Sequence, residues 1–261
     1  FLKTDSPLKT LTISSSMPME GKSLINILLA KTLNDMGERV LLIDADLRKP
    51  QIHNRLNLNN ILGLSNVLTD SNMSIERVIQ PLNDFPNISV ITAGTIPPDP
   101  TRLINSKRFK ELINEIKESN KYDMILFDSP PILGLADKIL LSKNLDGIIL
   151  LVGLGSVDRT LPKESLTRIK SNMANLFGIV TNTVNSNYAL QYSKYMNYKG
   201  YRNYNAYNPY LTYANYIKDT DKEKENNDPK ISKNNLLSEK IKAYFSLIKI
   251  SKKELFKWLD S

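Results

Sequence analysis

The chain has 261 residues, no cysteine and a formal net charge of +8 at pH 7. The lack of cysteine excludes disulfides and thiolate metal sites, and the length suffices for one α/β domain and a tail. The charge is uneven: residues 1–184 contain 21 Lys and Arg against 19 Asp and Glu, whereas residues 185–261 contain 14 against 8. We therefore expect a nearly neutral core that does not wrap nucleic acid, and a basic tail suited to an anionic membrane or an acidic partner.

The positions of short apolar runs predict the strands and helices, taken here in chain order. Short runs rich in Ile, Leu and Val predict strands at residues 8–14, 39–44, 88–93, 123–128, 146–152 and 176–182. Helices are expected between them at 22–36, 73–80, 101–119, 134–143 and 158–173. Strands that are apolar on both faces are typical of a parallel sheet covered on both sides. The pattern predicts an α/β fold, a three-layer sandwich with a mostly parallel central sheet, over residues 1–184.

The remaining residues differ in composition. Residues 185–217 are rich in Tyr and Asn and predict a flexible tyrosine cluster, and residues 218–235 predict a polar linker. Residues 236–261 regain an amphipathic helical pattern, which suits docking on the core, on a partner or on a membrane surface. The longest apolar run, residues 147–152, is too short to span a bilayer, and no signal peptide is recognisable. Because the sequence opens with Phe1 directly before a strand, we interpret it as a piece of a longer protein, which leaves an upstream membrane segment open.

A phosphate-binding loop is predicted at residues 15–23, SSMPMEGKS, between the first strand and a helix. Backbone N–H groups at the start of a helix and the positive end of its dipole bind phosphate. Lys22 reaches the β- and γ-phosphates, and the hydroxyl of Ser23 ligates Mg²⁺. We expect Ser16, Glu20 and Gly21 to contribute to the nucleotide site as loop residues. Ser16 stands where the usual pattern has Gly, which places the loop in the deviant branch of P-loop proteins.

Three aspartates follow predicted strands. Asp44 and Asp46 come at and after the end of one strand, and Asp128 ends another. Ligands of open α/β sheets bind beyond the carboxyl ends of the strands, so these side chains are expected to meet the phosphate site. One of the first two would orient or deprotonate the attacking hydroxyl while the other helps to hold the Mg²⁺ shell, so Lys22, Asp44 and Asp46 are the expected catalytic residues. Ser23, Asp46 and Asp128 are the expected metal residues, and Asp128 would bind Mg²⁺ usually through water. Helix capping is the alternative role for each aspartate.

Several blocks in the same order carry a family resemblance. The chain resembles the bacterial protein-tyrosine kinases of the polysaccharide co-polymerase system over about residues 8–184. The blocks that separate this group from the cell-division and partition ATPases sharing the loop are ADLRKP with GLS, IPPDP and DSPP; the matching segments are residues 15–23, 41–53, 60–68, 93–100 and 125–142.

The resemblance implies roles for single residues. It implies that Lys22 and Ser23 bind phosphate and metal, that Asp44 and Asp46 form the second aspartate motif, and that Asp128 is the Walker B carboxylate. Asn182 matches an Asn that contacts adenine in related ATPases, although a turn residue is an equal alternative. Further positions of interest are Met19, where the family normally has Gly, Arg48, which could neutralise phosphate or form a surface ion pair, and His53, which is expected to cap or pack.

The resemblance also implies ATP and Mg²⁺ as cofactors and a place on the cytoplasmic side of the bacterial inner membrane, this fragment itself being soluble. The implied partners are other copies of the chain, joined as nucleotide-bound subunits, and a membrane activator domain, either upstream or separate. Polysaccharide export machinery and a tyrosine phosphatase are implied as well, and nucleic acid is not.

Nine tyrosines of the tail, from Tyr192 to Tyr216, follow a strict period of three, which is neither a helix stripe nor a strand alternation, and Tyr188 lies just before them. With little aliphatic sequence around them, they are expected to be exposed and phosphorylated; they are Tyr188, Tyr192, Tyr195, Tyr198, Tyr201, Tyr204, Tyr207, Tyr210, Tyr213 and Tyr216. Stacking on single-stranded nucleic acid and low-complexity drift are alternatives.

The leading functional hypothesis is an ATP-dependent tyrosine kinase that phosphorylates neighbouring tails in trans and governs exopolysaccharide or capsule synthesis and export. A nucleotide-switched assembly scaffold with weakened catalysis is the second hypothesis, and Met19 motivates it. The third is a partition- or septum-type ATPase acting on DNA or membrane.

Overall fold

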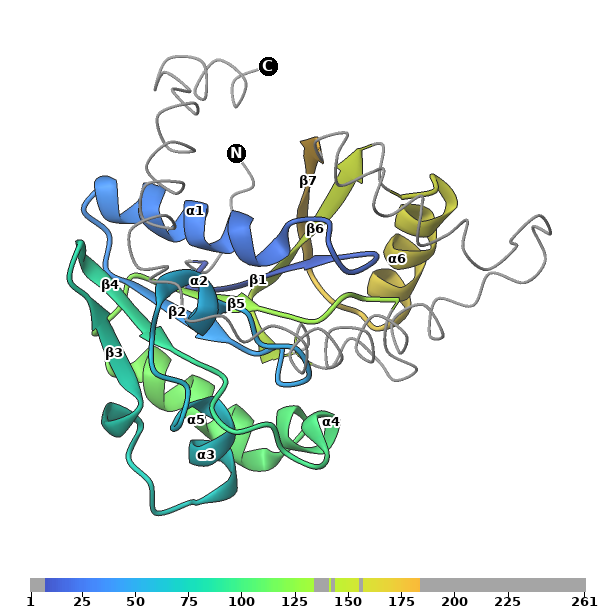
Figure 1. Cartoon of the computed structure of the whole chain (residues 1–261). Helices are drawn as coiled ribbons and strands as arrows, with labels where there is room; N and C mark the ends of the chain where they lie inside the picture. Colours follow the sequence, from blue (N-terminus) through green and yellow to red (C-terminus); the bar gives the residue numbers. More distant parts are fainter. Residues whose placement is uncertain (1–7, 134–140, 142–143, 155–156, 184–261) are drawn as a thin grey trace, which may run out of the picture. The chain divides into compact units, whose positions relative to one another are not determined.

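A seven-stranded sheet forms the centre of the fold in the computed structural model, which describes residues 8–133, 141, 144–154 and 157–183 (Figure 1). The strand order is β3-β4-β2-β5-β1-β6-β7, and every pair is parallel except β3 with β4. The strands are β1 (Thr10–Ser15), β2 (Val40–Asp44), β3 (Ile79–Leu82), β4 (Phe85–Ile91), β5 (Met124–Asp128), β6 (Gly147–Leu154) and β7 (Leu176–Thr183). The predicted α/β class with a mostly parallel sheet is confirmed.

Helices cover both faces of this sheet. The elements are α1 (Lys22–Asp35), α2 (Ile52–Leu56), α3 (Leu64–Thr69), the one-turn 3₁₀ helix η1 (Ile75–Arg77), α4 (Pro100–Ile104), α5 (Lys107–Glu118) and α6 (Thr160–Ser171). Figure 1 shows α1 on one side of the sheet and α3, α4 and α5 on the other. The alternation along β2 follows this division, since Val40 and Leu42 pack in the cluster with α1 while Leu41 and Ile43 pack in the cluster with α5.

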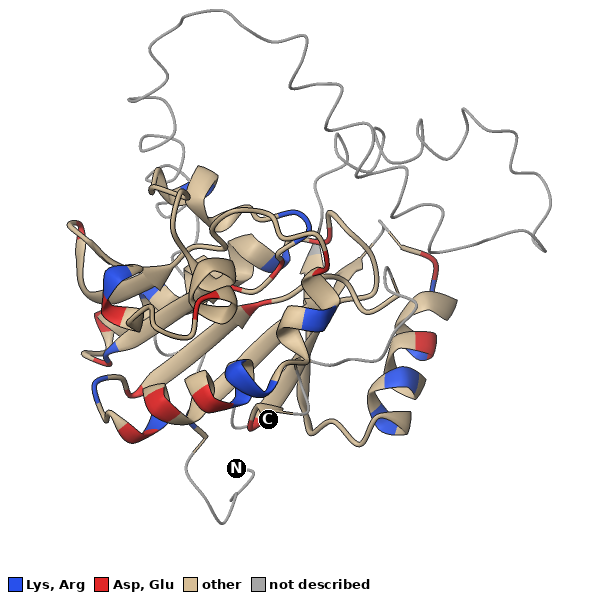
Figure 2. Cartoon of the chain, turned by 90° about the horizontal axis from the view of Figure 1, so that it is seen from below, with Lys and Arg blue, Asp and Glu red and all other residues tan. Residues whose placement is uncertain are grey.

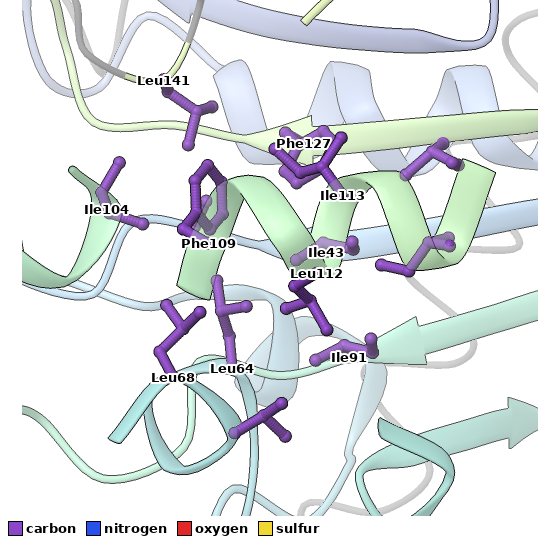
Figure 3. Close-up of a cluster of buried hydrophobic side chains, with 14 of the residues drawn as sticks. Ile43, Leu64, Leu68, Ile91, Ile104, Phe109, Leu112, Ile113, Phe127 and Leu141 are labelled. Carbon is purple, nitrogen blue, oxygen red and sulfur yellow. The ribbon is translucent and has the colours of Figure 1, made fainter. Parts of the chain in front are cut away.

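The core under α5 shows why this helix forms where it does. Ser106 caps it, its Oγ accepting a hydrogen bond from the N–H of Phe109 at 3.1 Å. Its apolar stripe lies on the sheet, and the rings of Phe109 and Phe127 meet edge to face with centroids 6.2 Å apart (Figure 3). Burial of this stripe, with Leu112 and Ile113 fully covered, fixes α5 against β2 and β5.

Register brings the functional ends of the strands together. β5 lies between β1 and β2, and Asp44 at the end of β2 is the register partner of Asp128 at the end of β5. The N–H of Ala45 continues the ladder to the carbonyl oxygen of Asp128 at 2.8 Å. The loops after β1, β2 and β5 therefore open at one edge of the sheet, where ligands of such folds bind.

Two helix predictions are wrong. The segment 73–80 forms only the turn η1 and then enters β3, because residues 79–82 pair antiparallel with β4 at the edge, where Pro81 is tolerated. The segment 101–119 is two helices, since the chain breaks at Asn105 and Ser106 restarts it as a cap. Both α2 and α3 were missed because they are one to two turns long.

Other predictions concern residues outside the described ranges. These include most of the helix at 134–143, the tyrosine cluster, the polar linker and the amphipathic segment 236–261. Among the residues that are described, no helix has the length and apolar character needed to cross a membrane. Figure 2 shows Lys and Arg positions interspersed with Asp and Glu positions along the ribbon of the described elements.

Candidate active site

The phosphate loop leads from β1 directly into α1. Gly21 is the N-cap of α1 with φ 102, a left-handed conformation that glycine adopts without strain. No side chain caps this helix, and its first turn holds no acidic residue, so the positive end of the dipole is left open to an anion. A 14-residue helix that starts with free N–H groups is suited to phosphate.

Lys22 and Ser23 follow at the start of α1. Lys22 is only 9% exposed, and its ammonium group interacts electrostatically with the carboxylates of Asp46 and Asp128. The hydroxyl of Ser23 lies near enough to the carboxylate of Asp128 to oppose the rise in its pKa. The structure thus brings together the lysine, the hydroxyl and the carboxylates that the sequence placed in separate motifs.

Asp44 is fully buried, and the backbone satisfies its carboxylate. It accepts hydrogen bonds from the N–H groups of Asp46 at 3.2 Å, Gln51 at 3.0 Å and Ile52 at 3.0 Å. Burial, followed by the charges of Asp128 and Asp46, raises its pKa well above the usual value. With both oxygens engaged, this side chain holds the start of α2 as well as contributing negative charge.

Asp46 is less fully engaged. Its Oδ1 accepts a hydrogen bond from the N–H of Lys49 at 3.1 Å, and 6% of the residue is exposed. Burial is the main cause that raises its pKa to about 6; Asp128 adds to the effect and Lys22 opposes it. A carboxylate with this pKa is suited to accept a proton near neutral pH.

Asp128 has a partner that sequence reasoning missed. The side-chain amide of Asn26 donates to its Oδ1 at 3.0 Å, and Asn26 is completely buried. The pKa of Asp128 is raised by burial, against the opposing effects of Lys22, Ser23 and Asn26. Asn26 lies four residues after Lys22 on the same helix face, so a buried polar residue one turn beyond the loop was the available signal.

The buried carboxylate of Glu20 stabilises the loop through hydrogen bonds. Its carboxylate accepts hydrogen bonds from the N–H of Met17 at 2.6 Å and the N–H of Gly153 at 2.7 Å. Only 1% of the residue is exposed, and burial raises its pKa. The side chain therefore faces the end of β6 and shapes the loop, so that any contact to nucleotide falls to its backbone.

Ser16 and Asn182 also hold the loop. The hydroxyl of Ser165 in α6 donates to the Oγ of Ser16 at 2.9 Å, with both residues buried. The side-chain amide of Asn182, at the end of β7, donates to the carbonyl oxygen of Glu20 at 2.9 Å. A Cβ on Gly21 would lie 2.7 Å from that amide nitrogen, so this close approach requires glycine.

Met19 occupies the tip of the loop with φ 68, a left-handed conformation that is costly for a residue with a side chain. It is 43% exposed. At this position, where the resembling family normally has glycine, a methionine adopts the left-handed conformation that glycine adopts without strain.

Arg48 and His53 lie beside the aspartates. A guanidinium nitrogen of Arg48 donates to the hydroxyl of Thr101 at 2.9 Å, which ties the loop after β2 to α4. His53 is half-buried in α2, and its carbonyl oxygen accepts a hydrogen bond from the N–H of Leu58.

The residues fit a nucleotide that arrives with Mg²⁺. No group of three or more His, Cys, Asp or Glu in the described part of the chain has the arrangement of a metal cage. Ser23 and Asp128 instead offer a hydroxyl and a carboxylate side by side, a donor set that Mg²⁺ completes with phosphate oxygens and water. The Oδ1 of Asn26 is buried and has no hydrogen-bond partner among the described residues, which leaves an acceptor for such a water.

Replacing Met19 tests the strained loop. We expect Met19→Gly to be more stable than Met19→Ala by about 1 kcal/mol, because only glycine adopts a left-handed φ without cost. Urea unfolding of the two variants measures the difference. At an ordinary position the order is reversed, so an alanine variant at least as stable as the glycine variant would contradict the assigned backbone.

Asp46→Asn tests the buried charge. A carboxyl whose pKa rises from 3.8 to about 6 on folding contributes stability below pH 3.8 that is lost as the pH rises through 6. The variant lacks this loss of stability. Without ligand, its free energy of unfolding should therefore exceed that of the unmodified chain by about 2–3 kcal/mol at pH 7, and most of the difference should disappear near pH 4. Chemical unfolding at both pH values measures this, with the exposed Asp84→Asn as the matched control. If the variant is less stable than the unmodified chain at pH 7, folding does not raise the pKa of Asp46 and the assignment is wrong.

Comparison with known proteins agrees with this geometry. Residues 9–154 match the family model described as an AAA domain. The tyrosine-protein kinase YwqD of Bacillus subtilis is 38% identical over 198 residues, covering 75% of this chain and 81% of that protein. The tyrosine-protein kinase Ptk of Acinetobacter johnsonii is 34% identical over 182 residues, covering 69% of this chain and 24% of that longer protein. The crystal structure of the chimerical protein CapA2B2 superimposes with a TM-score of 0.64 at 30% identity, covering 69% of this chain and 78% of that one. The chain belongs to the bacterial tyrosine-kinase family built on a P-loop AAA domain.

Proposed function

We propose that this chain is an ATP- and Mg²⁺-dependent protein-tyrosine kinase that phosphorylates the tyrosines of segment 185–217 on neighbouring copies. One observation carries the proposal: Lys22 and three buried aspartates converge at the uncapped start of α1. Family membership supports tyrosine as the acceptor. It also favours a kinase over a partition-type ATPase, for which ATP hydrolysis stimulated by DNA or lipid would be the sign.

ATP binding follows from the loop. The free N–H groups of α1 and the ammonium of Lys22 neutralise the phosphates, and Gly21 allows the backbone to approach them closely. Ser16 and Glu20 hold the loop in this form through Ser165 and Gly153. Asn182, hydrogen-bonded to the loop, is the residue proposed to contact adenine.

Phosphoryl transfer uses Asp46 as the base. The acceptor phenol gives its proton to the Asp46 carboxylate as its oxygen bonds to the γ-phosphorus, and the bond from that phosphorus to the β-phosphate oxygen breaks to release ADP. The pKa of about 6 suits Asp46 to this role, whereas the carboxylate of Asp44 is saturated by three backbone N–H groups. Ser23 and Asp128 would hold Mg²⁺, which neutralises charge on the phosphates when bound.

The partners follow from the same proposal. Nucleotide-bound copies associate so that one tail reaches another active site, and a membrane activator domain, upstream or separate, promotes this at the cytoplasmic face of the inner membrane. Phosphorylation of several tyrosines inverts the charge of segment 185–217, whose charged residues are Lys194, Lys199 and Arg202. That inversion, reversed by a tyrosine phosphatase, would regulate polysaccharide synthesis and export.

A second candidate is a nucleotide-switched assembly scaffold. The left-handed Met19 favours it, because a strained side-chain-bearing residue at the loop tip would disturb the positioning of the γ-phosphate for transfer, while Lys22 and the N–H groups of α1 would still bind nucleotide. This scaffold binds nucleotide and changes its association without forming phosphotyrosine.

Intact-mass measurement before and after incubation with ATP and Mg²⁺ tests the kinase. We expect successive additions of one phosphate mass, mapped to residues 188–216, which Lys22→Met abolishes because no other side chain replaces its charge at the phosphates. Lys31→Met, in the same helix but paired with Asp35 at 2.7 Å, is the matched control and should retain the activity.

The outcomes separate the candidates. Phosphorylation that persists in Lys22→Met would refute the assigned site. No phosphorylation even with a family activator segment, together with measurable nucleotide binding, would favour the scaffold.

A further inference from the structure

Three large apolar side chains are exposed on two neighbouring loops. Ile61 is 70% exposed, Leu62 36% and Ile96 62%. The first two precede α3, and Ile96 follows β4. We refer to these three residues as the apolar patch. Solvent exposure of several aliphatic side chains in one place is typical of an interaction surface.

The backbone under the apolar patch is held firmly. The side chain of Asn60 pairs with Gly94, accepting from its N–H at 2.9 Å and donating to its carbonyl oxygen at 3.1 Å. The hydroxyl of Ser65 donates to the carbonyl oxygen of Thr95 at 2.6 Å. The patch is thus presented by a preformed scaffold, which reduces the ordering cost of binding.

Two glycines show how closely the loops approach. A Cβ on Gly63 would lie 2.2 Å from the carbonyl oxygen of Thr92, and one on Gly94 would lie 2.2 Å from Oδ1 of Asn66. Neither position admits a side chain without moving backbone or breaking the Asn66 contact. The two loops therefore form one unit at the end of β4.

The apolar patch borders the proposed active site. β4 is the neighbour of β2, and β2 ends at Asp44. Parallel strands lie roughly 4.8 Å apart, so the loops beyond β4 start about one or two strand spacings from the aspartates. The patch and the aspartates lie at the same carboxyl edge of the sheet.

We propose that the apolar patch docks the tyrosine-bearing segment 185–217, holding one phenol ring while a tyrosine three residues away is phosphorylated. This rests on the proposed kinase function and identifies how that kinase selects its acceptor. The patch is a specificity surface and takes no part in the transfer step.

The period of three in the tail supports this occupant. In a polyproline-II conformation, which has three residues per turn and advances about 3.1 Å per residue, tyrosines three apart lie on the same side of the peptide, about 9 Å apart. Two strand spacings, about 10 Å, separate the end of β4 from the end of β5, where Asp128 lies. Between residues 185 and 217 tyrosines outnumber Leu, Ile and Val together, so phenol rings are the main apolar groups available for aliphatic side chains to cover.

Peptide acceptors test the docking directly. Two synthetic peptides cover residues 192–204, each keeping Tyr198; the other tyrosines are replaced by Phe in one and by Ala in the other. With the full chain as enzyme, the Phe peptide should have a KM about five- to tenfold lower than the Ala peptide, with kcat little changed, because its rings still bind the patch. In the Ile61→Ser/Ile96→Ser enzyme this difference should disappear.

A matched control uses exposed methionines elsewhere. Met36→Ser/Met173→Ser removes two apolar side chains, 61% and 88% exposed, at the far ends of α1 and α6, and should keep the preference for the Phe peptide. Nucleotide affinity should be unchanged in both double variants, which shows that the fold and the phosphate loop are intact.

Binding without turnover separates this inference from the kinase assignment. Fluorescence anisotropy of the labelled Phe peptide, measured without ATP, should show weaker binding to Ile61→Ser/Ile96→Ser than to the unmodified chain, even if no peptide is phosphorylated. Equal KM and equal binding of the two peptides, or a preference that survives in Ile61→Ser/Ile96→Ser, would overturn the docking proposal and leave the kinase assignment standing.

Discussion

The burial of like charges at the carboxyl edge of the sheet is the constraint on which the site depends. Asp44, Asp46 and Asp128 are buried together, and the ammonium group of Lys22 acts on the last two, joined at Asp128 by the charge of Arg55. Burial raises the pKa of all three carboxyl groups, and repulsion from neighbouring aspartates adds to the rise for Asp44 and Asp46. The backbone holds Asp44, and Asn26 supports Asp128, so the fold tolerates the charge without removing it. A divalent cation brought by a nucleotide would relieve this repulsion and would thereby couple ligand binding to stability.

The surrounding hydrogen bonds prepare the loop before any ligand arrives. Glu20 connects it to the end of β6, Asn182 connects it to the end of β7, and Ser165 connects Ser16 to α6. Since these partners belong to the sheet and its covering helix, the phosphate N–H groups are positioned by the rigid core. Preorganisation of this kind lets electrostatic stabilisation act without reorganising the site during transfer. Met19 is the exception, a strained residue at the tip of an otherwise supported loop.

The parallel strands and the residues at their carboxyl ends could be predicted from the sequence. Runs that are apolar on both faces identified the parallel strands, and the residues after them identified Lys22, Asp44 and Asp128 as neighbours, because carboxyl ends of parallel strands share an edge. The edge strand β3 was not predicted, since four residues containing Pro81 carry no strand period and gain their structure from pairing with β4. The burial of the Glu20 side chain against the end of β6 could not be predicted either. It depends on Gly153, which is 133 residues away and reaches the loop only through the sheet order.

The coupling of buried charge to ligand is measured most directly by the melting temperature with Mg²⁺ alone, ADP alone and both together, in the unmodified chain and in Asp128→Asn. The account predicts that the combined ligands raise the melting temperature by more than the sum of the separate shifts. It also predicts that Asp128→Asn loses this excess while keeping the shift due to ADP, because Ser23 and Asp128 would hold the cation only together with phosphate. Equal shifts for Mg²⁺ alone and for the combination, or an excess that survives in Asp128→Asn, would contradict the assigned role of the buried carboxylates.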